Sequence, residues 1–241
     1  MNPPADEREA RMELAAAFRV AVMFDFHEGI SNHFSMLVPD HDDRFLINPF
    51  GLHFSEITAS SLAVVGVDGT PISGVAPPTG IGIHAPIHRL CPQAAVVLHT
   101  PQPWTTALSM HDDLHLAPIS QTSLQFTDRV VYDERYEGLA DLDEGERLAK
   151  VLGEAEVMFL RHHGILVAGR ELGAAIDDLY MLEKAAQLQV LASGLGPLTP
   201  IGHETIERTR GQFADGMIEW GRMHWAALLR MVERTQPDFR D

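Results

Sequence analysis

Hydrophobic and polar residues follow the periods of helices and strands in turn along the chain. Apolar residues recur at helical spacing over residues 8–25, and Gly29 then ends the segment. Short apolar runs bounded by turn residues predict strands at 34–38, 44–47, 62–67, 94–98, 157–160 and 165–168. The stretch 71–82 is rich in proline and glycine, and this composition predicts a loop.

The clearest helical period runs from Leu172 to Val190, where apolar residues follow at steps of three and four before Gly194. Further helices are predicted at 84–90, 104–110, 143–152 and 204–233. The first of them contains Pro86, which a helix tolerates only in its first turn. Irregular alternation of strands and helices predicts an α/β domain with a central mixed sheet sandwiched between helices.

Composition and charge narrow the class of protein. The chain is 45% hydrophobic and 22% charged, as in globular proteins, and its net charge of −16 argues against nucleic acid and anionic membranes as partners. The single cysteine, Cys91, excludes an intrachain disulfide framework. Residues 1–12 are polar, and no apolar run approaches the roughly 20 residues of a membrane span, so we expect a cytoplasmic protein.

Thirteen histidines are the unusual feature of the composition, and two of them follow apolar strands. His99 ends the run 94–98, and His163 follows the run 157–160 in the turn Arg161-His162-His163-Gly164. Imidazole is a common ligand for transition metals. If the two strands are neighbours, we expect the side-chain nitrogens of His99 and His163 to lie within about 3–5 Å, as two ligands of one metal would.

Two other patterns are weaker when taken alone. The segment 29–35, Gly-Ile-Ser-Asn-His-Phe-Ser, leaves small and amide-bearing residues between a helix and a strand, where backbone N–H groups can meet an anion. A plain turn would look the same. His84 and His88 would share one face of a helix, and a chance pair of surface histidines would also have this spacing.

In their order along the chain, these motifs resemble the class II aldolase/adducin family over residues 8–193. The resemblance is carried by the segment 29–35, Asn48-Pro49-Phe50-Gly51, His84, Val97-Leu98-His99-Thr100 and Arg161-His162-His163-Gly164-Ile165-Leu166. The segments 117–121 and 136–138 are most similar to the adducin-like bacterial branch. The resemblance implies a family domain over 8–194, followed by a C-terminal linker and helix over 195–241 at a subunit interface. It also implies an assembly of four subunits and a small molecule as the substrate.

The resemblance also implies a divalent metal ion, usually zinc, held by three histidines. His99 matches the first ligand and His163 the third, whereas the second falls on Pro101, which cannot bind a metal. We therefore expect the metal to be held weakly, with partial occupancy, or to be absent. His84 is the candidate that would complete a triad with these two. A fourth ligand, if there is one, would come from His53, Glu56 or His88.

The family's acid/base and substrate positions are altered too. Its catalytic glutamate falls on Gly80, and its pair of hydroxyl residues for a sugar phosphate falls on Pro78 and Thr79. Asn32, Ser35 and Thr79 are the predicted substrate-binding residues. The catalytic base is not assigned, and its candidates are Tyr132, Tyr136, Asp112 and, from a neighbouring subunit, His203, Glu204 or His224.

Two classes of function remain open. The retained histidines favour a metal-dependent lyase that performs aldol cleavage or decarboxylation on a small oxygenated carbon acid. Gly80 and Pro101 favour a non-catalytic, adducin-like oligomeric binding or scaffold protein with a vestigial site; a small-molecule binding protein is a weaker third reading. The C-terminal helix indicates either packing on the domain's own core or a homo-oligomer, because its apolar residues cover more than one helix face: Phe213, Met217, Trp220, Met223, Trp225, Leu228 and Met231. We expect the homo-oligomer, and the resemblance implies that it is a tetramer with the crevice close to a subunit boundary.

Overall fold

A mixed sheet of eight strands organises the residues that the computed structural model describes, which are 3–113, 115–214 and 216–241. The strand order is β4-β3-β2-β1-β5-β8-β7-β6, in which β6 and β7 are parallel and all other neighbours antiparallel. The strands are β1 (His33–Leu37), β2 (Arg44–Ile47), β3 (Ala63–Gly66), β4 (Pro71–Ser73), β5 (Val96–Thr100), β6 (Val130–Asp133), β7 (Val157–Leu160) and β8 (Gly164–Gly169).

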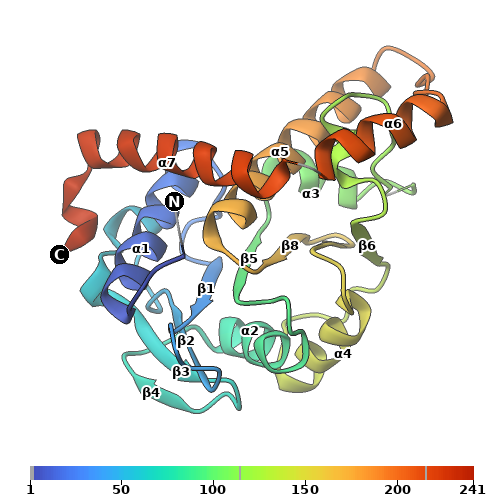
Figure 1. The fold of residues 1–241 in the computed structure, drawn as a ribbon. Helices are drawn as coiled ribbons and strands as arrows, with labels where there is room; N and C mark the ends of the chain where they lie inside the picture. The colour runs from blue at the N-terminus through green and yellow to red at the C-terminus, as the bar shows by residue number, and fades with distance from the viewer. Residues whose placement is uncertain (1–2, 114, 215) are drawn as a thin grey trace.

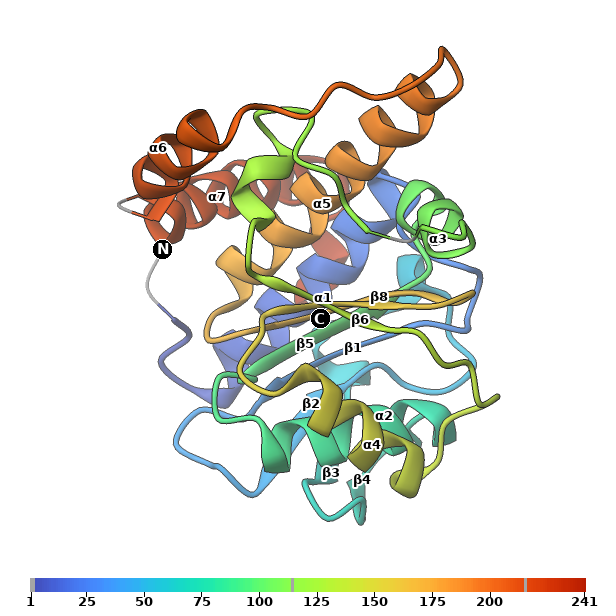
Figure 2. The ribbon, with the colours of Figure 1, turned by 90° about the vertical axis from the view of Figure 1, so that its right-hand side faces the viewer.

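Helices cover both faces of the sheet, as the hydrophobic pattern predicts (Figures 1 and 2). One face carries α1 (Glu7–Met23), α3 (Pro103–Ser109), α5 (Leu172–Ser193) and α7 (Met217–Thr235), and the other carries α2 (Pro78–Leu90) and α4 (Leu142–Leu152). The remaining helical elements are α6 (His203–Ala214), η1 (Phe54–Glu56), η2 (Ala59–Ser61), η3 (Ser123–Phe126) and η4 (Pro237–Arg240). None of the helices in the described part of the chain is both long and apolar enough to cross a membrane.

Alternation along the central strands decides which side chains meet α2. In β1, Phe34 and Met36 enter the core beneath α1 and α5, so His33 and Ser35 point to the opposite face. In β5, Leu98 enters the same core, and His99 therefore shares the α2 face with His33. One strand period thus brings β1 and β5 histidines to the same side of the sheet.

The stretch 71–82 is not wholly a loop, and this prediction was wrong. Pro71–Ser73 form the edge strand β4, and α2 begins at Pro78. Proline is well suited to the first helical position because its missing N–H has no partner there. The expectation for Pro86 was also wrong, since it lies within α2 and not in its first turn.

The packing of α2 on α4 explains how Pro86 is tolerated. Proline at 86 leaves the Gly82 carbonyl without its helical N–H donor, and α4 crosses α2 at this point. A Cβ atom added to Gly145 of α4 would lie only 1.9 Å from the Gly82 oxygen and 2.8 Å from Cγ of Pro86. The two glycines therefore let the helices approach closely.

The C-terminal segment was predicted as one helix and forms two, α6 and α7, with Gly216 at the N-cap of α7. The inner face of α7 packs against α5 and α1 of the same chain and buries Gly221, Trp225, Leu228 and Val232. Trp225 and Leu228 are thus part of the domain's own core.

Strand β6 was not predicted, because its side chains are only partly buried and show no clear alternation.

Candidate functional site

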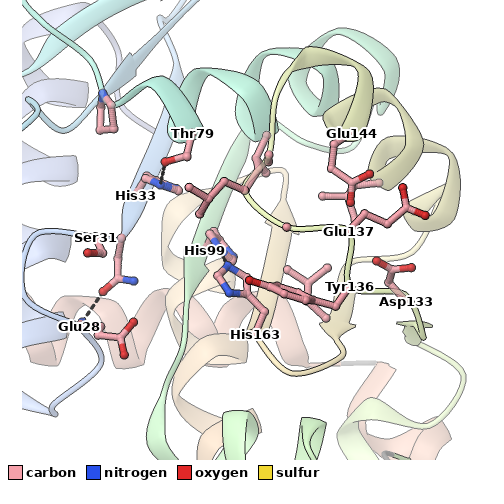
Figure 3. A pocket seen from close by; sticks show the side chains of 18 of the residues that line it. Glu28, Ser31, His33, Thr79, His99, Asp133, Tyr136, Glu137, Glu144 and His163 are labelled. Carbon is pink, nitrogen blue, oxygen red and sulfur yellow. Dashed lines mark hydrogen bonds between the residues drawn. The ribbon is translucent and has the colours of Figure 1, made fainter.

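A cavity of about 420 Å³ opens where β1 and β8 begin and β5 and β7 end. Figure 3 shows His99 and His163 between two walls of polar side chains, which include Glu28, Ser31, His33 and Thr79 on one side and Asp133, Tyr136, Glu137 and Glu144 on the other. The remaining lining residues are Ile30, Asn32, Phe50, Pro77, Ile83, Arg135, Gly138, Leu139, Ala140, Leu148, Leu160 and Arg161.

His99 and His163 meet at the cavity as the strand pattern predicts. Strand β8 lies between β5 and β7, so the turn that carries His163 comes beside the end of β5. The two Nε2 atoms are 3.0 Å apart, within the predicted range. The Nδ1–H of His99 donates to the Ile165 carbonyl at 2.9 Å, so its Nε2 keeps a lone pair that faces His163.

His33 is a third histidine in the cavity, and sequence reasoning missed its part in the site. Its ring stacks on His99 at a centroid distance of 5.4 Å, and Cα register in the β1–β5 pair places the two residues opposite one another. His33 Nε2 lies 3.2 Å from Oγ1 of Thr79. Alternation with the buried Phe34 was the available signal, but only the strand pairing turns it into a contact with His99.

Ser35 and His84, predicted as a substrate-binding residue and a metal ligand, are not among the residues that line the cavity. The Nδ1–H of His88 donates to the Ala94 carbonyl at 2.7 Å, so Ser35 Oγ–H donates to His88 Nε2 at 2.7 Å. Ser35 Oγ in turn accepts from Nδ1 of His84 at 2.5 Å. Strand alternation turns Ser35 towards α2, and its side chain is fully buried there.

The expected His84/His99/His163 triad is not assembled. His33 lies between His84 and His99, with ring centroids 5.3 Å from the first and 5.4 Å from the second. Among the described residues, no three histidine, cysteine, aspartate or glutamate side chains form a group with metal-binding geometry. The Nε2 atom of His84 is buried without a hydrogen-bond partner in the structure.

Asn32 and Thr79 do line the cavity. Asn32 Oδ1 accepts a hydrogen bond from the Glu28 backbone N–H, which leaves its amide N–H groups as the donors for a ligand. Gly80, at the position of the family's glutamate, has little free space. A Cβ atom there would lie 3.0 Å from Cδ1 of Ile47 and 3.1 Å from Cδ2 of His33.

Four carboxylates line the cavity, and three of them are engaged by arginines. Arg147 binds both Asp133 at 2.6 Å and Glu144 at 2.7 Å, and Arg135 lies 3.6 Å from Glu137. Glu28 has no ion pair with any residue that the structure describes. Burial lowers the pKa of His163, and the charge of Glu28 partly offsets this lowering. The sequence offered no motif that would have singled out Glu28.

The other candidate residues separate clearly. Tyr136 lines the cavity with its ring centroid 6.3 Å from that of His163, whereas Tyr132 accepts from the Leu116 N–H and stacks on Phe159. Asp112 does not line the cavity. His53 and Glu56 cap η1, and His224 pairs with Asp177. The remaining candidates for a fourth ligand or for a partner's base also lie outside the lining, and with these three they are His53, Glu56, His88, His203, Glu204 and His224.

Burial keeps these imidazoles neutral. It lowers the pKa of His33 to about 3 and that of His88 to about 4, and it lowers the pKa of His84 and His99 well below the usual range. Neighbouring imidazoles act in the same direction on His33, His84 and His99. The pKa of His163 is also lowered by burial. At neutral pH each of these imidazoles is therefore uncharged and has one unprotonated ring nitrogen with a lone pair, as a metal ligand requires.

Comparison with known proteins identifies the family. Residues 12–190 match the family model described as Class II Aldolase and Adducin N-terminal domain. The chain belongs to the class II aldolase/adducin family. It is similar to an aldolase II superfamily protein from Pseudomonas syringae, with 40% identity, a TM-score of 0.92 and coverage of 99% of this chain and 97% of the other.

Two further relatives are an aldolase and an adducin. L-fuculose 1-phosphate aldolase from Glaciozyma antarctica is 26% identical, with a TM-score of 0.88 over 98% of this chain and 93% of the other. Alpha-adducin from Mus musculus is 31% identical over 94% of this chain, and the match covers 33% of that longer protein. The chain thus has aldolases and an adducin among its relatives.

Class II aldolases typically depend on zinc, and the donor set of this chain would fit a divalent metal ion in part. His99 and His163 present facing nitrogens, and a carbonyl behind His99 is the usual partner of a metal-binding histidine. Pro101 has no donor atom at the position of the second family ligand. Two imidazoles would therefore hold the metal, and its other positions would be left for water or substrate.

Proposed function

We propose that this family member is a metal-dependent lyase that cleaves a carbon–carbon bond, by aldol cleavage or decarboxylation, in a small oxygenated carbon acid. The observation that carries the proposal is the 3.0 Å approach of the His99 and His163 Nε2 atoms in a cavity open to ligands. Zinc is the metal we expect, because neutral imidazoles suit it.

The residues around the pair have distinct parts in this proposal. A bound divalent metal would supply a Lewis acid that stabilises negative charge on a substrate oxygen. The Asn32 amide would donate to a substrate oxygen, and Thr79 would orient His33 beside it. Glu28, the lining carboxylate without an ion pair among the described residues, would accept or return the proton in place of a glutamate at 80.

Zinc titration of metal-free protein by calorimetry tests the proposal. We expect one site per chain, with affinity at least ~10-fold weaker in each of His99→Ala and His163→Ala, because each variant removes one of two ligands. His203→Ala is the matched control, since His203 is exposed on α6 outside the cavity. Equal zinc affinity in all four proteins would refute the site.

Catalysis requires its own measurement. Zinc-loaded protein should release an aldehyde or carbon dioxide from a panel of small hydroxy and oxo acids. Glu28→Gln should lower kcat by about 10²-fold or more while it leaves zinc affinity unchanged, as expected for loss of a general base. Glu154→Gln, an exposed change outside the cavity, is the control. If Glu28→Gln turns over normally, the base lies elsewhere.

A non-catalytic binding or scaffold protein is the second candidate, and specific residues favour it. Gly80 and Pro101 replace the family's base and one metal ligand, and the similarity to alpha-adducin fits the same reading. Under this alternative the protein takes up no stoichiometric zinc. The zinc titration therefore separates the two functions.

A further inference from the structure

One part of the cavity wall is apolar, and this part has no role in the chemistry proposed above. Ile83 of α2, Leu148 of α4 and Leu160 at the end of β7 all line the cavity. They belong to one hydrophobic cluster between these helices and the sheet, and each is only 4–5% exposed. Ala140 packs against the same cluster and also lines the cavity. A sugar chain would bring hydroxyl groups against this wall without hydrogen-bond partners.

The cavity also offers a phosphate few hydrogen-bond donors. Arginines engage three of its four lining carboxylates, so charge does not by itself separate a phosphate from a carboxylic acid. The α2 N-terminus, which reaches the cavity through Pro77 and Thr79, would be the natural anion site. However, Pro77 and Pro78 have no N–H group, so this helix start has fewer donors to offer a phosphate.

We infer that the site takes an unphosphorylated 2-oxo or 2-hydroxy acid that carries an apolar ring. This inference rests on the proposed function for the acid end of the molecule, which would lie at His99 and His163. The ring would lie against Ile83, Leu148 and Leu160, with the Tyr136 ring as an aromatic neighbour at the mouth. The apolar wall therefore sets the substrate class, while the histidine pair sets the chemistry.

Ligand binding by matched acids tests the inference. Phenylpyruvate, pyruvate and dihydroxyacetone phosphate are titrated into the protein, with and without zinc, and binding is followed by NMR. We expect phenylpyruvate to bind about 10- to 100-fold more tightly than pyruvate, as burial of a ring predicts, and more tightly than the phosphate. Equal affinity for the two oxo acids, or tighter binding of the phosphate, would overturn it.

A variant that fills the apolar space assigns the preference to this wall. Ala140→Phe should weaken phenylpyruvate binding far more than pyruvate binding and so remove most of the preference for phenylpyruvate. Ala107→Phe adds the same ring at an exposed position of α3 outside the cavity, and it should change the affinity for neither acid. If Ala140→Phe does not fold, Ala140→Leu should reduce the preference in the same direction. An undiminished preference in a folded variant would contradict the assignment.

The zinc-free arm keeps the two proposals separate. The contribution of the ring should be present with and without zinc, because it comes from apolar contact alone. If zinc does not bind while the ring preference persists, the lyase proposal fails and the substrate class stands. If zinc binds to the histidines but the acids do not differ, the substrate class fails and the metal site stands.

Discussion

A single residue after β5 decides how many imidazoles the site offers. Residue 101 is two positions beyond His99, and alternate residues along an extended segment point the same way. Pro101 occupies that position here, and its Cα lies 2.7 Å from where a Cβ on Gly164 would be, so the backbone is closely packed. From this alternation we expect residue 101 to face the histidine pair, although Pro101 itself is not among the residues that line the cavity.

Pro101→His should restore the missing ligand. We expect zinc affinity to rise by about 10- to 100-fold, by analogy with the loss seen when partners of a metal site are removed. Loss of proline should lower the free energy of unfolding by no more than about 1 kcal/mol. Competition with a zinc-binding dye measures the first effect and urea unfolding the second. Pro92→His is a comparison that adds a histidine on another segment. A folded Pro101→His protein with unchanged affinity would show that residue 101 does not face the pair.

Glu13 makes the stability of the protein depend on pH. Burial of its carboxyl in α1, and then the charge of Glu9, raise the pKa of Glu13 from 4.5 to about 7. The folded state thus holds this proton more tightly than the unfolded chain does. The stabilisation is fully present below about pH 4.5 and is lost as pH rises through about 7.

Glu13→Gln should remove this dependence. Its free energy of unfolding should match that of the natural chain near pH 4.5 and exceed it by on the order of 1–2 kcal/mol above pH 7, allowing for partial exposure. Urea unfolding from pH 4.5 to 8 measures the difference. Glu7→Gln, on the exposed start of the same helix, controls for a general charge effect. A difference that does not vary with pH would contradict the raised pKa.

At the scale of elements, the contact between α2 and α4 sets one side of the cavity. Gly145→Ala would drive a methyl group into the Gly82 carbonyl at 1.9 Å. We expect the free energy of unfolding to fall by about 1–3 kcal/mol, as in other overpacked sites. Gly211→Ala in α6 has no atom within 4 Å of the added group, and it should stabilise by up to about 1 kcal/mol. Thermal unfolding of both variants checks the pair, and equal effects would argue against a close crossing.

The same elements show how far the sequence could be interpreted. Strands β2 and β7 have the predicted bounds, and the meeting of His99 with His163 was predicted because both follow apolar strands. The start of α2 was missed, because Pro77, Pro78, Gly80 and Gly82 form a loop-like composition. Proline is acceptable at the start of a helix, and Gly82 serves the contact with α4.

The rest of the site depends on distances between elements, which local patterns do not contain. His33 enters the cavity because β1 pairs with β5 in a particular register. Ser35 does not line the cavity, because its hydroxyl forms hydrogen bonds with His84 and His88 of α2. Glu28 becomes notable only when the other lining carboxylates are seen to be paired.

At the scale of the whole molecule, exposed apolar side chains occur on two helices of one face. The C-terminal part of α5 extends away from the sheet (Figure 2), whereas α7 begins beside the N-terminal part of α5, where Gly221 lies against Ala174. Leu188, Leu191 and Leu195 are 47%, 54% and 93% exposed, and their spacing places Leu188 and Leu191 on one face of α5. On α7, Trp220 and Met223 are also about half exposed. The two helices therefore carry, at separate places, apolar side chains that the domain core does not cover.

We predict a homotetramer in which these side chains lie between subunits. Light scattering should give fourfold the chain mass of 26.6 kDa, because the family resemblance implies four subunits. Exposed leucines on one helix face are an independent reason to expect association, since they need a second surface and symmetric assembly supplies it. Leu191→Glu should shift the protein towards smaller species at micromolar concentration, since a buried charge without a partner is costly. Ser193→Glu adds the same charge nearby on an exposed position of α5 and should leave the mass unchanged. The prediction would fail if the natural chain were monomeric at that concentration. If the tetramer persisted in Leu191→Glu, the assembly would stand and its interface would have to use another surface, with Met223→Glu on α7 the next variant to measure.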